Sequence, residues 1–147
     1  MQTVNAISKP EIDTVHTVLN NKFGTLYADI WKVGVNMSLR ISDLLSLRYD
    51  DLDIEGRAVQ LVERKTGKKK TVRLNEPAVA IIKRRMLQYP SDTWLFEVHS
   101  NRAKHKPISR VSVSRIFKEA GDMAGLSINT HTMRKSRGKA MFDAGVP

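Results

Sequence analysis

Two stretches of the chain place an arginine where it could bind a phosphate. In "NTHTMRKSRG", His131 and Arg134 are three residues apart, so a helix would present both side chains from one face. In "SLRISDLLSLR", Arg40 stands one position before an apolar stripe at helical spacing, and Asp43 follows within reach of an ion pair. With Asp43 supporting it, the fork of the Arg40 guanidinium could face a phosphate. The alternatives are an ordinary exposed ion pair, and a surface histidine beside an arginine that contacts a DNA backbone.

A third stretch, "RKTGKKKTVR", carries six Lys or Arg residues and no acid. Such a loop would repel itself in water, which favours a phosphate partner. Lys65 lies at the end of a predicted strand, where a sheet could aim its ammonium group into a groove to donate a proton. Further along the chain, "NRAKHK" resembles a second loop that contacts phosphates. The residues that we expect to contact DNA are Arg64, Lys68, Lys69, Lys70, Arg73, Arg102, Lys104, His105, Lys106, Arg110 and Lys135.

The spacing of the remaining histidines argues against a metal site. His16, His99 and His105 are scattered, none lies one turn from another, and the sequence suggests no accompanying acid cluster. We therefore expect neither a metal nor a cofactor. Two arginines, a lysine and a histidine favour phosphoryl transfer, because fixed cations can neutralise the charge on non-bridging oxygens.

The charge of the chain is unevenly distributed. Residues 1–60 hold 6 Lys/Arg against 8 Asp/Glu, whereas residues 61–147 hold 19 against 7. A one-sided positive field attracts polyanions, so nucleic acid is the favoured partner over a lipid surface or a small molecule. The chain has no cysteine, no apolar run of membrane-spanning length and no signal-peptide core. These features favour a soluble intracellular protein.

The predicted fold is α+β and mostly helical, and the length of 147 residues fits one domain. A capping box at "SKPE" starts the first helix, Gly24 separates it from a second, and a third runs from about Ser38. Two strands, "AVQLVE" and "TVRL", form a hairpin with Gly67 at its tip. Asn75 and Ser109 each cap a further helix, "TWLF" is a short extended piece, and a last helix spans about 130–144.

These stretches together resemble the catalytic domain of the tyrosine recombinases, the phage integrase family. The resemblance rests on "LRISDLLSLRYDDLD", "ERKTGKKKTVRL" and "THTMRKSRGKAMFDAG", which follow one another in the family's order on a helix, a hairpin and a helix. It implies a helical bundle with a small antiparallel sheet, covering residues from about 8 to the end.

The resemblance also implies a role for each matching residue. Arg40 and Arg134 would clamp the scissile phosphate, and Lys65 would act as general acid toward the 5′-oxygen. His131 would assist proton transfer at the attacking hydroxyl, and Asp43 would support Arg40. In such enzymes a tyrosine attacks DNA to give a 3′-phosphotyrosine, which a 5′-hydroxyl resolves without ATP or metal.

The chain departs from the family pattern at its ends. The second His or Trp of the family and its nucleophilic Tyr follow the "HxxR" helix and do not occur within residues 1–147, and neither does the N-terminal DNA-gripping domain. We therefore expect residues 1–147 to form a single partial catalytic domain that cannot cleave DNA alone. Ser38, two positions before Arg40, is a mild variation.

Several expectations about the cell follow from the resemblance. The partners would be double-stranded DNA and other recombinase protomers, forming a tetrameric synapse in the intact enzyme. The location would be the bacterial cytoplasm, with the nucleoid. The alternatives are a non-enzymatic nucleic-acid-binding module, whose cations would not converge, and an accessory protein of a recombination complex.

Overall fold

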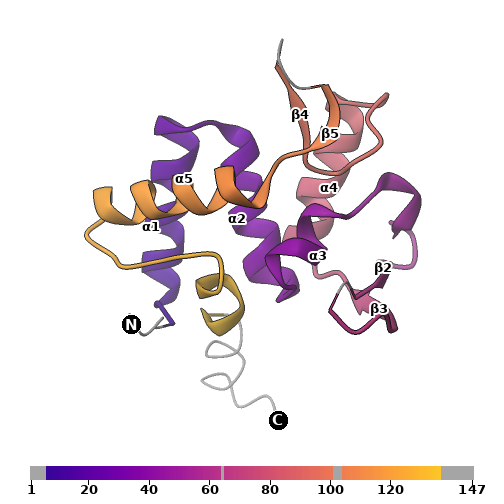
Figure 1. Ribbon diagram of the computed structural model, residues 1–147, viewed down its shortest axis with the longest axis horizontal. Coiled ribbons are helices and arrows are strands. Elements are labelled where there is room, and N and C mark those ends of the chain that lie inside the picture. The colour runs from indigo at the N-terminus through magenta and orange to yellow at the C-terminus, as the bar shows by residue number, and fades with distance from the viewer. Residues whose placement is uncertain (1–5, 64, 101–103, 137–147) are drawn as a thin grey trace.

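The structure, a computed structural model, describes residues 6–63, 65–100 and 104–136. This part of the chain is mostly helical and carries two small antiparallel sheets, which agrees with the predicted fold class (Figure 1). The elements are α1 (Lys9–Lys22), α2 (Thr25–Met37), α3 (Ile41–Leu45), η1 (Tyr49–Asp51), β1 (Leu52–Asp53), β2 (Ala58–Val62), β3 (Lys69–Arg73), α4 (Glu76–Gln88), β4 (Glu97–His99), β5 (Lys104–Pro107) and α5 (Arg110–Met123).

Local side-chain caps determine where three of the helices begin. The Ser8 hydroxyl accepts a hydrogen bond from the Glu11 N–H at 3.3 Å, and the Glu11 carboxylate accepts one from the Ser8 N–H at 2.8 Å. The side chains of Asn75 and Ser109 each accept a hydrogen bond from the backbone N–H three residues on. These contacts satisfy N–H groups that a helix start would otherwise leave unpaired, which is why the three starts are readable from sequence.

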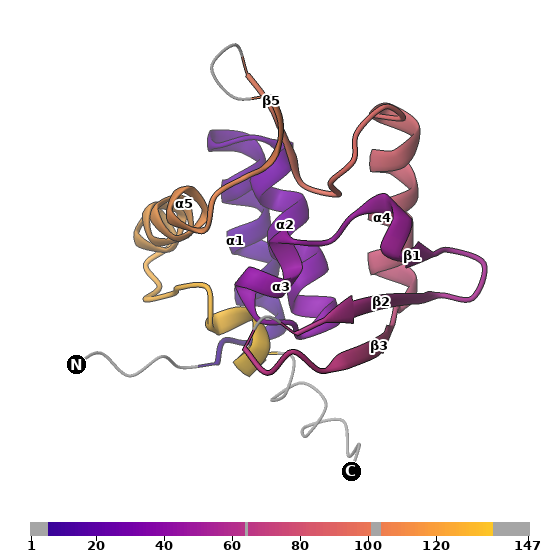
Figure 2. The same cartoon turned by 45° about the vertical axis from the view of Figure 1, so that its right-hand side comes forward.

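One part of the apolar core lies where α5 crosses α1 and α2 (Figures 1 and 2), and the same cluster continues through α3 and α4. Trp31 of α2 and Phe117 of α5 are both fully buried and meet edge to face, with ring centroids 5.3 Å apart. The Trp31 indole N–H donates to the Ile12 carbonyl of α1 at 3.1 Å, which joins α1 to the same cluster. These contacts hold α1, α2 and α5 together.

A buried ion pair fastens α4 to α2. The Arg85 guanidinium lies 2.9 Å from the Asp29 carboxylate, and both side chains are almost fully buried. Arg84 also contacts Asp29, and Arg85 donates a further hydrogen bond to the Leu95 carbonyl at 3.0 Å. The charge of Asp29 is therefore compensated inside the protein.

The first sheet has the strand order β1–β2–β3, and its β2–β3 hairpin pairs Val59 with Val72 and Val62 with Lys69. The sequence led us to expect one sheet, but β4 and β5 form a second antiparallel pair. "TWLF" was expected to be extended; instead Trp94 makes an isolated bridge to Arg48, and the strand begins at Glu97. Side-chain alternation is too short in this region to set the strand limits.

The prediction that a helix runs from about Ser38 was wrong by three residues. Ser38 ends α2 in the left-handed conformation (φ 59, ψ 34), and α3 begins only at Ile41. The helix expected over 130–144 is described as far as residue 136, with residues 132–136 helical. Within the described part of the chain, every helix is too short or too polar to cross a lipid bilayer.

Candidate functional site

Arg134, near the end of the described chain, contacts the loop that leads into Arg40. Arg134 Nε donates a hydrogen bond of 3.0 Å to the Ser38 carbonyl, across 96 positions of sequence. Arg40 follows two residues later as the N-cap of α3, in an extended conformation. The loop 38–40 thus carries one arginine directly and holds the other through its backbone.

Close packing against α2 sets the position of the 132–136 segment. Met133 is fully buried, and a Cβ added to Gly34 would overlap its sulfur atom. The Ser136 hydroxyl accepts a hydrogen bond from the Ile7 N–H at 3.1 Å, which fastens the far end of the segment. A glycine in α2 therefore leaves the space in which Met133, and with it Arg134, is seated.

The segment begins with its own capping contacts. The Thr132 hydroxyl, which is buried, accepts a hydrogen bond from the Asn129 N–H at 3.0 Å, and the Asn129 side chain accepts one from the His131 N–H at 2.8 Å. The His131 side chain is exposed and Arg134 is half-buried. His131 is therefore open to a ligand, while Arg134 is fixed by its backbone contact.

The ion pair that the structure describes for Arg40 goes to Glu63. Arg40 Nη1 lies 3.4 Å from Glu63 Oε2, and the two side chains are 40% and 19% exposed. Asp43 is itself buried at 4% exposure. Glu63 was not among the predicted site residues and appeared in the sequence only as part of the hairpin. The sequence did offer one indication that Glu63 could pair with a cation, since it is the acid directly before the run of Lys and Arg residues.

Lys65 lies in the turn between β2 and β3, because β2 ends at Val62, so the prediction that it lies at a strand end was wrong. The Glu63 N–H donates to the Lys68 carbonyl at 2.9 Å, and the Gly67 N–H donates to the Glu63 carbonyl at 2.8 Å. Gly67 has φ +71, as a tight turn requires of a residue without a Cβ. The Lys65 side chain is exposed. Because Glu63 closes this turn and also contacts Arg40, the hairpin and the start of α3 are coupled.

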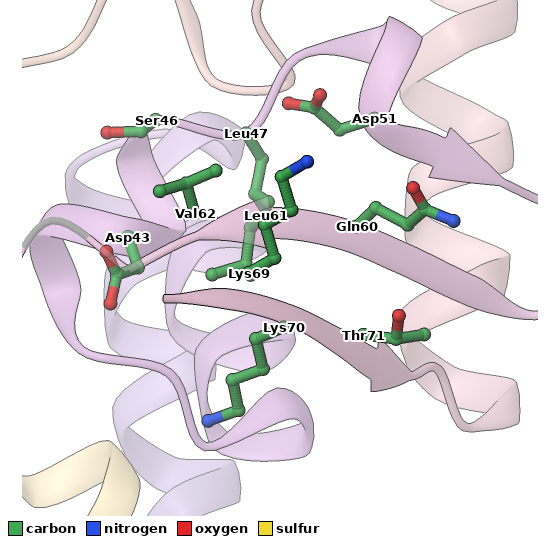
Figure 3. Close-up of a pocket in the computed structure, with 10 residues that line it drawn as sticks. All are labelled: Asp43, Ser46, Leu47, Asp51, Gln60, Leu61, Val62, Lys69, Lys70 and Thr71. Carbon is green, nitrogen blue, oxygen red and sulfur yellow. The ribbon is translucent and has the colours of Figure 1, made fainter. Parts of the chain in front are cut away.

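A cavity of about 490 Å³ opens between α3 and the β2–β3 hairpin (Figure 3). Acids from α3 and η1 and cations from β3 line it, and Figure 3 shows Lys69 and Lys70 leaving β3 toward opposite sides. This alternation follows from the pleat of a strand and divides the two cations between the faces of the hairpin. The lining residues are Asp43, Ser46, Leu47, Asp51, Gln60, Leu61, Val62, Lys69, Lys70 and Thr71.

The predicted DNA contacts lie mostly on open surface where they are described. The side chains that the structure leaves exposed are those of Lys68, Lys69, Lys70, Arg73, His105, Lys106, Arg110 and Lys135. Lys104 begins β5, next to the exposed His105. Arg64 and Arg102 lie outside the described residues.

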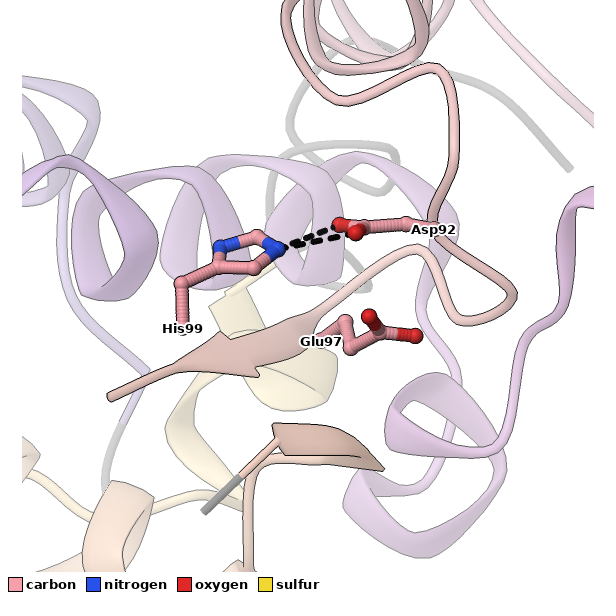
Figure 4. A group of neighbouring side chains, drawn as sticks. All are labelled: Asp92, Glu97 and His99. Carbon is pink, nitrogen blue, oxygen red and sulfur yellow. Dashed lines mark hydrogen bonds and ion pairs between the residues drawn. The ribbon is translucent and has the colours of Figure 1, made fainter. Parts of the chain in front are cut away.

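The described residues hold one group with metal-ligand chemistry, which the sequence did not suggest. The ligand atoms of Asp92, Glu97 and His99 lie within 4.8 Å of one another (Figure 4). His99 Nε2 is 2.7 and 2.9 Å from the two Asp92 oxygens, and Glu97 accepts a hydrogen bond from the Thr93 N–H at 3.0 Å. The Tyr89 ring stacks on His99 at 4.3 Å. These contacts explain the cluster as a brace for the loop between α4 and β4.

The pKa values of the two carboxyl groups in this cluster, Asp92 and Glu97, are shifted in opposite directions. Burial raises the pKa of Asp92, although the hydrogen bond with His99 acts against it. Burial also tends to raise the pKa of Glu97, but the hydrogen bond from the Thr93 N–H helps to bring that pKa below its usual value. Glu97 thus holds its charge more firmly than Asp92.

The three tyrosines of residues 1–147 are engaged in packing. The Tyr49 hydroxyl donates to the Tyr89 carbonyl at 3.0 Å, and burial raises the pKa of Tyr49 to about 12. Burial also raises the pKa of Tyr27. Tyr89 is occupied by its stacking on His99. A raised pKa works against a nucleophilic oxygen, because it keeps the hydroxyl protonated.

Comparison with known proteins assigns the chain to a family. Residues 6–147 match the model described as the phage integrase family. The chain is 30% identical over 108 residues to the tyrosine recombinase XerA of Pyrococcus furiosus, covering 74% of this chain and 38% of that protein. It is 34% identical over 143 residues to the probable integrase/recombinase YoeC of Bacillus subtilis, covering 94% and 73%.

The fold agrees with this assignment. A crystal structure of the lambda integrase bound to DNA superposes with a TM-score of 0.78 at 16% identity, covering 98% of this chain and 53% of that one. The chain thus spans about two fifths of the XerA sequence and about half of this integrase structure. It belongs to the phage integrase family, the tyrosine recombinases.

Proposed function

We propose that residues 1–147 bind duplex DNA and supply the phosphate-activating part of a site-specific recombinase active site. The single observation that carries this proposal is the 3.0 Å hydrogen bond from Arg134 to the Ser38 carbonyl, two residues before Arg40. A module that contacts DNA only through scattered cations has no need to fix one arginine on the loop that leads into another. The similarity to the tyrosine recombinase XerA and to the probable integrase/recombinase YoeC supports the same function.

The proposed chemistry is cleavage and rejoining of a DNA strand. Arg40 and Arg134 bind the non-bridging oxygens of one phosphodiester and stabilise the charge that develops there. Lys65 gives a proton to the departing 5′-oxygen, and His131 assists proton transfer at the attacking hydroxyl. Asp43, a buried residue of α3 three positions after Arg40, supports the loop that carries Arg40. A tyrosine oxygen forms the new bond to phosphorus, giving a 3′-phosphotyrosine that the 5′-hydroxyl of a partner strand later resolves.

We propose that none of the three tyrosines in residues 1–147 is this nucleophile. The half-buried, hydrogen-bonded Tyr49 and the packed Tyr27 and Tyr89 hold structure instead. The polypeptide of residues 1–147 alone is then inactive in forming covalent protein–DNA adducts. Its partners are duplex DNA and further recombinase protomers, and it acts in the cytoplasm where the DNA is found.

The experiment replaces the tyrosine with a small external nucleophile. Hydrogen peroxide, whose anion can attack phosphorus, is added to the polypeptide of residues 1–147 and a labelled duplex. We expect no covalent protein–DNA adduct without peroxide, and peroxide-dependent strand cleavage that Arg40→Ala and Arg134→Ala each slow by roughly 100- to 1000-fold. Both variants keep most of their DNA affinity, because many other cations contact the backbone.

The matched control is Arg115→Ala, which removes the same charge from the exposed surface of α5. It should leave cleavage unchanged. Equal loss of cleavage and DNA binding in Arg40→Ala and Arg134→Ala would mean that these arginines are only binding residues. A covalent adduct formed by residues 1–147 alone would overturn the assignment of the three tyrosines.

A further inference from the structure

In the structure Arg40 pairs with the Glu63 carboxylate, whereas the proposed function requires Arg40 to bind a phosphate of DNA. Arg40 is 40% exposed and has Glu63 Oε2 at 3.4 Å from Nη1. A carboxylate and a phosphate present the same kind of oxygen to a guanidinium, and the fork of arginine suits both. One guanidinium edge cannot hold both anions in full contact. DNA binding at Arg40 therefore competes with Glu63.

We propose that Glu63 is a displaceable counter-ion, which holds Arg40 in the free protein and gives it up to a phosphate of the DNA backbone. The inference rests on the proposed role of Arg40 as a phosphate-binding residue. Glu63 is in this sense a positioning residue: it keeps the guanidinium close to the β2–β3 hairpin until DNA replaces it. The repulsion between a bound phosphate and the Glu63 carboxylate then drives that side chain away.

The exchange also links Arg40 to the turn that carries Lys65. Glu63 closes this turn through its backbone, donating to the Lys68 carbonyl and accepting from the Gly67 N–H. These hydrogen bonds do not involve the carboxylate, so the turn keeps its closing contacts when the side chain leaves. The Arg40 contact is the additional restraint on the hairpin, and DNA releases it at the moment when Lys65 is needed at the same phosphate.

The partial exposure of the pair limits the size of the effect. Exposed ion pairs contribute little because water and salt screen them, and the measured range corresponds to roughly a one-and-a-half- to fivefold change in an equilibrium constant. A counter-ion of this strength can be displaced by one phosphate without blocking DNA binding. The gain in DNA affinity expected on removing the Glu63 charge is therefore small, and its measurement needs a matched control.

The test compares Glu63→Gln with Glu55→Gln in the polypeptide of residues 1–147. Glu55 is exposed in the turn between β1 and β2, so both variants raise the net charge by one, but only Glu63→Gln frees Arg40. Affinity for a short labelled duplex is measured by fluorescence anisotropy over a series of salt concentrations. We expect Glu63→Gln to bind roughly two- to fivefold more tightly than Glu55→Gln at low salt. Its salt dependence should be steeper by up to about one unit of logarithmic slope, because in Glu55→Gln the displaced Glu63 carboxylate takes up a salt cation and offsets one released from the DNA.

The second variant, Glu63→Asp, keeps the net charge and shortens the side chain by one methylene. It should bind DNA more tightly than the parent chain although its formal charge is the same. Combining Arg40→Ala with Glu63→Gln should remove the higher DNA affinity that Glu63→Gln has over Glu55→Gln. Equal affinities and slopes for Glu63→Gln and Glu55→Gln, with Glu63→Asp equal to the parent, would overturn the inference.

The two proposals fail in different ways. If Arg40→Ala strongly slows peroxide-driven cleavage while Glu63→Gln and Glu55→Gln bind DNA equally, Arg40 binds the phosphate and only the counter-ion role of Glu63 is wrong. If Arg40→Ala cleaves as well as Arg115→Ala does, the role of Arg40 is wrong, and the role of Glu63 fails with it.

Discussion

Replacing Gly34 with alanine should inactivate the site without touching any residue that contacts DNA. The added Cβ would overlap the Met133 sulfur and approach Leu44 Cδ2 to 3.1 Å, and Met133 is fully buried. The Met133 side chain must therefore move, and the 132–136 segment with it. The 3.0 Å hydrogen bond from Arg134 to Ser38 lies one residue away and depends on that seating.

The two consequences of this change differ in size. Overpacking lowers the free energy of unfolding by about 1–3 kcal/mol, whereas alanine in place of glycine inside a helix raises it by about 1 kcal/mol. The net loss of stability is then about 0–2 kcal/mol, and the domain should remain folded. A displacement of about 1 Å at a phosphate-binding group can cost on the order of 100-fold in rate. We therefore expect a large loss of peroxide-driven cleavage beside a small change in the free energy of unfolding.

Urea unfolding and the peroxide cleavage assay, run on the same preparations, separate these effects. The control is Gly24→Ala, at the opposite end of α2, where φ is +113 and no atom lies within 4 Å of the added Cβ. That variant loses stability through backbone strain alone and should keep its cleavage per folded molecule. Met133→Ala combined with Gly34→Ala should cost less than the sum of the two single changes, because it removes the overlap. Full cleavage by folded Gly34→Ala would refute the claim that this packing positions Arg134.

Two further predictions concern stability. Asp29→Asn removes the charge that faces the buried Arg85 and should cost about 3–5 kcal/mol in the free energy of unfolding, measured in urea; a loss below about 1 kcal/mol would contradict the account of that pair. Burial raises the pKa of Tyr49 to about 12 from an ordinary value of 10.0. The folded state therefore holds this proton more tightly, and the stability it contributes is complete below pH 10 and is lost as the pH rises toward about 12. Tyr49→Phe should flatten the fall in stability across this window, and identical pH profiles for the two proteins would be evidence against the shift.

Local signals account for the parts of the fold that could be predicted. The capping residues Ser8, Asn75 and Ser109 specify helix starts through hydrogen bonds to N–H groups three residues away, so neighbouring sequence is sufficient. The β2–β3 hairpin is similarly local, with Gly67 supplying the left-handed turn residue. The α+β, mostly helical class follows from these elements.

The contacts that assemble the site are not local, and the sequence did not reveal them. The left-handed conformation of Ser38 is imposed where α2 ends, and its carbonyl is used by an arginine 96 positions away. The pairing of Arg40 with Glu63 depends on how the hairpin lies against α3, whereas the sequence offered Asp43 as the nearer acid. The Asp92–His99 contact was missed because a loop, not a helix, brings these two residues together. The roles of Lys65 and His131 stay predictions that the cleavage assay addresses.

The central claim is that Arg40 and Arg134 act on one phosphate, and a double-mutant cycle in the peroxide cleavage assay tests it most directly. Rates are measured for the parent chain, Arg40→Ala, Arg134→Ala and the double variant, at a DNA concentration that saturates all four. Groups that act as a unit are strongly non-additive, so the double variant should be about as slow as either single variant. Losses that multiply, with each arginine contributing independently of the other, would contradict the account.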